Sequence, residues 1–84
     1  MSDDTETELD KILRAVRDLA EKKEEYKLVS PKEISVYLDK DLNNVHSRLN
    51  ELFKKGFVEK PLKRVFYKIT KDGEEYLDRL VKIE

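Results

Sequence analysis

The hydrophobic pattern of this chain changes its period at Gly56, and this change restricts the possible folds more than any other feature. Before Gly56, apolar residues recur every three or four positions, which predicts amphipathic helices. After it, residues 57–60 and 65–69 are rich in β-branched and aromatic residues, which predicts two strands. A further helical pattern follows. Because 84 residues are enough for one small core, we expect a single α+β domain that is mostly α.

Four capping signals predict where the helices begin. Thr5 and Glu8 fit a capping box that opens the first helix, and Ser30-Pro31-Lys32-Glu33 fits a second one with proline at the first helical position. Asp41 is a good N-cap residue for a third helix, and Thr70 can cap a last one. Gly56 suits the left-handed residue that follows the end of the third helix.

The connecting segments and the core follow from the same pattern. We expect the first helix to end near residues 21–25, a brief strand at 27–29, a polar turn at 39–41 and a hairpin loop at 61–64. The expected core residues are Leu9, Ile12, Leu13, Val16, Leu19 and Ala20 in the first helix, Ile34, Tyr37 and Leu38 in the second, Leu42, Val45, Leu49, Leu52 and Phe53 in the third, and Tyr76, Leu77, Leu80 and Val81 in the last.

Composition excludes several classes of protein. The chain is 38% hydrophobic and 44% charged, which is typical of a folded domain, and it has no apolar run near the roughly 20 residues of a membrane span. The absence of cysteine excludes disulfides and thiolate chemistry. The acidic N-terminus resembles no signal peptide, so we expect a cytoplasmic protein. Residues 1–4 are expected to be disordered and 5–84 to form the domain. The Lys- and Glu-rich composition also suits a thermophile.

Neutral hydrogen-bonding side chains gather in one short segment. The chain has no glutamine, and its three asparagines, Asn43, Asn44 and Asn50, lie with its one histidine, His46, within eight positions. Residues 26–70, which include this segment, carry ten bases and five acids, whereas both ends of the chain are acidic. A lone histidine without cysteine is a poor metal site, and we expect His46 to pack at a helix edge or to contact a phosphate.

The order of elements and two sequence runs resemble a known family. Two helices joined by a short turn and followed by a basic hairpin are the parts of a winged helix-turn-helix. SPKEISVYLDKDLNNVHSRLNELFKKGFVEK resembles the helix-turn-helix of small prokaryotic, possibly archaeal, winged-helix regulators of the MarR-, ArsR- and PadR-like groups, and VFYKITKDGEEYL is similar to their second wing strand and last helix. The resemblance implies sequence-specific binding to double-stranded DNA by a homodimer that represses transcription.

Helical geometry indicates which side chains would contact DNA. With the apolar stripe of residues 42–55 buried, Asn43, Ser47 and Asn50 face the opposite side, and Asn44 lies beside them. Asn pairs with adenine, Arg with guanine, and Ser with several bases. Because the N-terminal residues of a recognition helix approach the bases, the predicted base contacts are Asn43, Asn44, Ser47 and Arg48. An alternative is that Asn43 and Asn44 only help to start the helix.

The remaining predictions concern phosphates, subunits and rival functions. Basic residues around the third helix and in the wing are expected to contact the DNA backbone, and the apolar side of the last helix is expected to form a dimer interface. Nothing in the sequence forms a catalytic triad, a metal cluster or a phosphate loop, so we expect no enzyme, no cofactor and no metal. The alternative is a winged helix that binds protein within a replication, transcription or partition complex. The expected backbone contacts are Lys32, Lys40, Lys54, Lys60, Lys63 and Arg64, and the expected interface residues are Leu77, Leu80, Val81 and Ile83.

Overall fold

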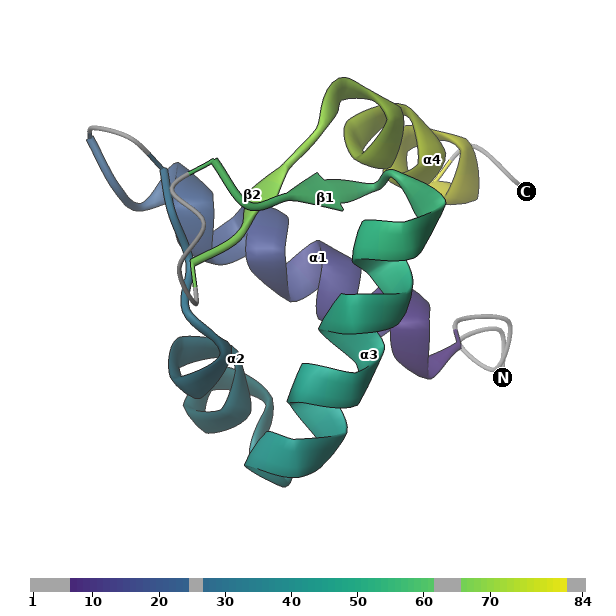
Figure 1. Ribbon diagram of the computed structural model, residues 1–84. Coiled ribbons are helices and arrows are strands. Elements are labelled where there is room, and N and C mark those ends of the chain that lie inside the picture. The colour runs from purple at the N-terminus through teal and green to yellow at the C-terminus, as the bar shows by residue number, and fades with distance from the viewer. Residues whose placement is uncertain (1–6, 25–26, 62–65, 82–84) are drawn as a thin grey trace.

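The computed structural model describes residues 7–24, 27–61 and 66–81. Over these residues the chain is α+β and mostly helical, and its two short strands pair antiparallel, with Val58 opposite Ile69 (Figure 1). None of the described helices is long and apolar enough to cross a membrane. The elements are α1 (Glu8–Glu21), α2 (Pro31–Leu38), α3 (Leu42–Lys55), β1 (Val58–Glu59), β2 (Lys68–Ile69) and α4 (Lys71–Val81).

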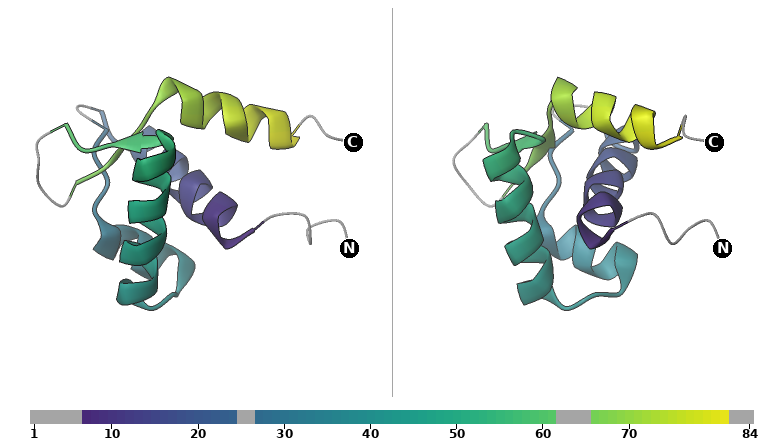
Figure 2. Two further views of the ribbon diagram at one scale, coloured as in Figure 1. Left: turned by 45° about the vertical axis from the view of Figure 1, so that its right-hand side comes forward. Right: turned by 90° about the vertical axis from the view of Figure 1, so that its right-hand side faces the viewer.

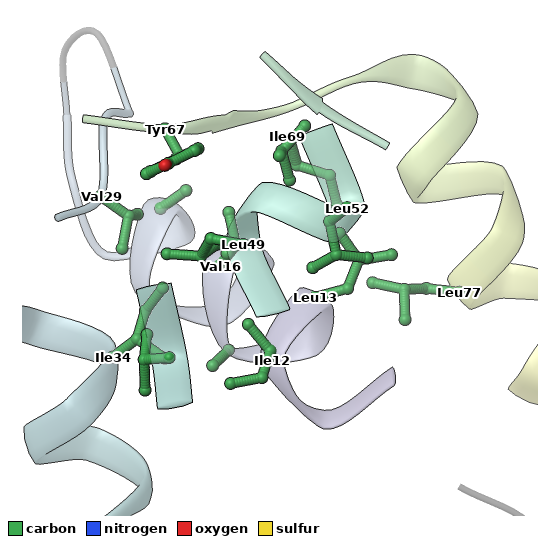
Figure 3. Packing of buried hydrophobic residues seen from close by; sticks show 14 residues of the cluster. Ile12, Leu13, Val16, Val29, Ile34, Leu49, Leu52, Tyr67, Ile69 and Leu77 are labelled. Atoms are coloured by element: carbon green, nitrogen blue, oxygen red, sulfur yellow. The ribbon is translucent and has the colours of Figure 1, made fainter. Parts of the chain in front are cut away.

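Helix α1 lies at the centre of the fold. It contacts α2, α3, α4 and β2, and Figure 2 shows α2 and α4 at opposite ends of α3 with α1 between them. Side chains from every element meet around α1 (Figure 3). The buried apolar residues are Ile12, Leu13, Ala15, Val16, Ala20, Val29, Ile34, Val45, Leu49, Leu52, Val58, Tyr67, Ile69 and Leu77, with Leu9, Leu19, Leu38, Phe57, Tyr76 and Leu80 packed against them. Most of the predicted core is therefore confirmed.

The predicted start of α1 is wrong by two residues. Thr7 is the N-cap: its hydroxyl accepts a hydrogen bond from the Asp10 amide at 3.2 Å, and Asp10 Oδ2 accepts one from the Thr7 amide at 3.1 Å. Thr5 lies outside the described residues. Thr7-Glu8-Leu9-Asp10 is an equally good capping box, and Asp10 has a second partner, because Tyr76 of α4 donates to its Oδ1 at 2.6 Å.

Helix α2 starts as predicted. The Ser30 hydroxyl accepts from the Glu33 amide at 3.3 Å, and Pro31 is the first helical residue. The Glu33 carboxylate pairs with Lys23 of the segment after α1 at 3.1 Å, so this contact to a neighbouring element takes the place of the return bond of the capping box. Tyr37, expected in the core or at its edge, is 44% exposed, and its hydroxyl donates to Asp18 of α1 at 3.3 Å.

Helix α3 ends as predicted, but its buried stripe is narrower than expected. Gly56 follows it with φ 85°, a left-handed conformation that favours glycine. Asp41 precedes it in the N-cap position, although its carboxylate accepts no capping bond in the described structure. Leu42 and Phe53 are 39% and 43% exposed. Both lie at the edge of the apolar stripe, on the side of the exposed His46, whereas Val45, Leu49 and Leu52 are buried. Their predicted burial is therefore wrong.

The sheet is shorter than the predicted strands and is extended by a single bridge. Val29 and Tyr67 exchange two backbone hydrogen bonds of 2.9 and 2.8 Å, which attaches the segment before α2 to the sheet. The brief strand expected at residues 27–29 is therefore this bridge. The bridge and the sheet connect the region before α2 to the region after α3, and they fix the relative positions of the two helices.

Helix α4 is held against the end of α3 by Thr70 and Gly73. The Thr70 hydroxyl accepts from the Gly73 amide at 3.1 Å, as its predicted capping role requires, and it donates to the Gly56 carbonyl at 2.7 Å. A Cβ on Gly73 would lie 2.3 Å from the Phe57 carbonyl oxygen. The close approach of α4 to the segment after α3 therefore requires glycine at position 73.

Candidate nucleic-acid interface

The exposed surface of α3 consists of three rows of side chains along its axis. Residues three or four positions apart are neighbours on a helix surface, so each row takes about one residue from each turn. The row opposite the buried stripe is called the outward row, and the rows on its two sides are called the α1-facing row and the sheet-facing row. The outward row is Asn43, Ser47, Asn50 and Lys54; the α1-facing row is Asn44, Arg48, Glu51 and Lys55; the sheet-facing row is Leu42, His46 and Phe53.

The outward row presents uncharged hydrogen-bonding groups to solvent. Asn43, Ser47 and Asn50 are all exposed, and Figure 1 shows α3 at the front of the molecule with α1 behind it. Within the described part of the chain, none of these three side chains takes part in a hydrogen bond. On the opposite side of α3, Val45, Leu49 and Leu52 are buried in the core. This burial fixes the orientation of the outward row.

The α1-facing row contains the two predicted base contacts that are less accessible. Asn44 and Arg48 are both half-buried. Arg48 Nη1 lies 3.5 Å from Glu51 Oε1, and its positive charge also contributes to lowering the pKa of Glu8 at the start of α1. The Nε of Arg48 is buried and has no hydrogen-bond partner among the described residues. Arg48 is therefore oriented along the surface toward acids of its own chain.

The sheet-facing row is apolar at both ends. Leu42 and Phe53 are exposed there, with His46 exposed between them. The ammonium of Lys60 lies 5.5 Å from the centre of the Phe53 ring and 5.4 Å from that of Tyr67, within the range of a cation–π contact. These two contacts place Lys60, which follows β1, beside the C-terminal half of α3.

A salt bridge to α1 occupies Lys40 in the turn between α2 and α3. Lys40 Nζ lies 2.7 Å from Glu8 Oε2. The hydrogen bond and the charge of Lys40 lower the pKa of Glu8 below its usual value of 4.5, with smaller contributions from Arg48 and Lys11. A phosphate at this turn would have to compete with Glu8 for Lys40. Sequence reasoning could not show this pairing, because Glu8 and Lys40 belong to elements far apart in the chain.

The other predicted phosphate-binding bases differ in their surroundings. Lys32 is exposed in the first turn of α2, where the free amides of a helix favour an anion. Lys54 is exposed at the end of the outward row. Lys63 and Arg64 lie outside the described residues. The described bases on or beside α3 that have no ion pair are therefore Lys54, Lys55 and Lys60, and Lys32 has none on α2, where it lines a groove with Leu19 and Val36.

The predicted dimer interface is wrong for Leu77. This residue is 0% exposed and belongs to the core of one chain, because α4 turns it toward α1. Leu80 is half-buried against the same core. The side chain of Val81 and the whole of Ile83 lie outside the described residues. Along the described part of α4, the exposed side is charged, and its residues are Lys71, Asp72, Glu74, Glu75, Asp78 and Arg79.

Exposure distinguishes two further residues of this surface. Asn50, which is not among the four predicted base contacts, is exposed in the outward row, whereas the predicted contact Asn44 is half-buried. His46 was expected at an edge, and it is exposed between Leu42 and Phe53. The exposure of Asn50 and His46 follows from the row in which each lies, and it can be predicted only when the elements beside each row are known.

No group of three or more metal-binding side chains occurs among the described residues.

Comparison with known proteins does not add to these observations. No model of a protein family matches the chain, and no curated protein matches it.

Proposed function

We propose that this chain is a winged helix-turn-helix protein that binds double-stranded DNA with α3 in the major groove, in a binding role rather than a catalytic one. The observation that carries the proposal is the outward row of α3. It presents Asn43, Ser47 and Asn50 side by side, exposed and unbonded within the described structure, on a helix whose opposite side is fixed in the core. Amides and hydroxyls of this kind match the donors and acceptors of base edges in the major groove.

The arrangement of elements supports this proposal. Helix α2 and α3 are joined by three residues, 39–41, and Asp39 ends α2 in a left-handed conformation with φ 55°. In the proposed fold, α2 and α3 are the helix-turn-helix, and β1, β2 and the loop between them are the wing. The wing would then stand next to the sheet-facing row, where Lys60 contacts the Phe53 ring.

Phosphate contacts in this proposal come from four bases around α3. Lys32 lies in the first turn of α2, Lys60 follows β1 and lies over the Phe53 ring, and Lys54 and Lys55 lie in the last turn of α3. Each phosphate neutralised by such a base releases counterions, which makes binding weaken as the salt concentration rises. Phosphate contacts fix the register of a protein on DNA, whereas the outward row would read the bases.

We further propose that the protein regulates transcription, as a repressor that acts as a homodimer. Leu80 is the one described interface candidate that keeps some exposed surface. A two-fold dimer would read two half-sites about one DNA turn, or 34–36 Å, apart. The enriched site in a selection experiment should then be approximately palindromic.

The test is selection from a random-sequence duplex library, followed by a salt titration of the selected duplex. Ser47→Ala should weaken binding by about 1–3 kcal/mol and relax the preference at one base pair. Lys54→Ala should weaken all sequences alike and reduce the salt slope by about one. Arg79→Ala is the control, because Arg79 is an exposed base in the last turn of α4, at the end of that helix that points away from α3 in Figure 2. Failure to bind any duplex at low salt would contradict the proposal.

A second candidate function is a winged-helix module that binds protein within a replication, transcription or partition complex. It is favoured by an apolar surface between α1 and α2, where Val36 is 74% exposed and Tyr37 44% exposed. Together with Leu19 they line a groove of about 480 Å³. This module would leave the protein without affinity for duplex DNA even at low salt, so the same titration separates the two functions.

A further inference from the structure

The surface of α3 combines amide groups, exposed apolar side chains and an arginine that is turned aside. The amides and the hydroxyl occupy the outward row. Leu42 and Phe53 occupy the adjacent sheet-facing row, with 39% and 43% of their surfaces exposed. The one arginine of α3, Arg48, is in the row on the other side and pairs with Glu51. These three facts point to one type of base pair.

Base pairs differ in what they offer in the major groove. Adenine presents N7 and N6 to a bidentate amide, and thymine presents a methyl group to an apolar side chain. Guanine presents two acceptors, which arginine or lysine contacts best. From the geometry of α3 we infer that it reads an A·T-rich site, with Asn43 and Asn50 on adenine edges and Leu42 and Phe53 against thymine methyl groups. This inference rests on the proposed binding of duplex DNA.

The dimensions of the helix fit such a site. Leu42 and Phe53 are eleven positions apart, which is about 16 Å along a helix axis. The same length of duplex contains about five base pairs at 3.4 Å each. Asn43 and Asn50 are two turns apart in the outward row, and along the helix they lie between Leu42 and Phe53. Two amide contacts would therefore be flanked by an apolar contact at each end of one short stretch of the groove.

The lysines near α3 are not expected to contact guanine. Lys54 and Lys55 lie in the last turn, and the proposed function already assigns them to phosphates rather than to bases. Lys60 lies over the rings of Phe53 and Tyr67. Its ammonium covers one side of the Phe53 ring and stands at the edge of the surface, where a phosphate rather than a base would meet it. The cations therefore border the amide and apolar rows.

The test uses base analogues that each remove one feature of the major groove. The duplex selected from a random library is remade with 7-deazaadenine, which lacks the N7 acceptor, with uracil, which lacks the thymine methyl, or with 7-deazaguanine as the control. Binding is measured by fluorescence anisotropy. We expect an A·T-rich site, a loss of about 5- to 150-fold for 7-deazaadenine at a contacted position, a loss of about 4-fold for uracil, and little change for 7-deazaguanine.

Variants connect each loss to a residue. Asn43→Ala or Asn50→Ala should bind adenine and 7-deazaadenine duplexes equally well. Leu42→Ala or Phe53→Ala should bind thymine and uracil duplexes equally well. All four side chains are exposed, so these changes leave the buried stripe of α3 intact.

The outcomes separate this inference from the proposal on which it rests. A G·C-rich site, a loss only with 7-deazaguanine, or binding without any enrichment would overturn the inference while leaving duplex binding in place. A·T preference that is indifferent to both 7-deazaadenine and uracil would overturn it too, because the protein would then be reading the shape of the duplex. Absence of binding to every duplex at low salt would overturn both.

Discussion

The hydrogen bond between Tyr76 and Asp10 offers the most direct test of how this fold is held together. Asp10 is 3% exposed, and its carboxylate accepts from the Tyr76 hydroxyl at 2.6 Å and from the Thr7 amide at 3.1 Å. The Tyr76 ring also stacks on Phe57, with ring centres 4.8 Å apart. This one residue therefore connects α4 both to the start of α1 and to the segment after α3.

Tyr76→Phe removes the hydroxyl and keeps the ring. Hydrogen bonds to charged groups contribute about 1.5–3 kcal/mol, and a buried carboxylate that loses its donor keeps its desolvation cost. We therefore expect the free energy of unfolding to fall by about 1.5–3 kcal/mol. For a domain of this size that corresponds to a decrease in Tm of about 6–24 °C. Urea denaturation followed by circular dichroism would measure the loss, and thermal unfolding would check it.

Tyr37→Phe is the matched control. The Tyr37 hydroxyl also donates to an aspartate, Asp18, but at 3.3 Å and on an exposed surface. Surface substitutions of this kind change stability by about 0.5 kcal/mol or less. If Tyr76→Phe cost no more than Tyr37→Phe, the reasoning that burial and the short hydrogen bond make Asp10 a structural anchor would be refuted.

The same hydrogen bond predicts a loss of stability at alkaline pH. The hydrogen bond to Asp10, together with burial and the negative charge of Asp10, raises the pKa of Tyr76 from 10.0 to about 12. Because the folded state holds the proton more tightly, the stabilisation is fully present below pH 10 and disappears as the pH rises toward 12. The difference in unfolding free energy between the wild type and Tyr76→Phe should therefore shrink over this range. A difference that stays constant from pH 9 to pH 12 would contradict the assignment.

Two further predictions concern packing and charge. Gly73→Ala should reduce the free energy of unfolding by about 1–3 kcal/mol, because its Cβ would lie 2.3 Å from the Phe57 carbonyl oxygen and 2.9 Å from Ile69 Cγ1. The loss would be measured as a lower midpoint of urea denaturation. An unchanged midpoint would mean that α4 approaches Phe57 less closely than described. If the protein binds DNA as proposed, Glu8→Gln should break the salt bridge of Lys40 and leave it free to bind a phosphate. DNA binding at low salt should then tighten, and its dependence on salt concentration should steepen by up to about one unit of slope. An unchanged slope in anisotropy titrations would show that Lys40 contacts no phosphate.

Local signals accounted for the elements of this fold. The sequence correctly predicted the start of α2 at Ser30, the end of α3 at Gly56 and the cap of α4 at Thr70. Each of these residues acts on amides or backbone angles within a few residues of itself. The predicted start of α1 was wrong, because the sequence contains two overlapping capping boxes, one at Thr5 and one at Thr7. The box at Thr7 is the one formed, and its acid also accepts a bond from Tyr76, which is 66 positions away.

The candidate site was predictable only in part, for the same reason. Periodicity alone placed Asn43, Ser47 and Asn50 opposite the apolar stripe, because a helix with a fixed buried side has a fixed exposed side. The sequence could not show that Leu42 and Phe53 stay exposed, since this depends on how much of α3 its neighbours cover.

The sequence by itself determined the helices, the turn between α2 and α3, the change to strands after Gly56 and the amide side of α3. All of these depend on caps, dihedral preferences and periods that act over a few residues. Tertiary structure alone decided that Lys40 pairs with Glu8, that Tyr76 bonds to Asp10, and that Lys60 lies over Phe53. These contacts join residues from different elements, and whether two such side chains meet depends on how the helices and strands pack around α1.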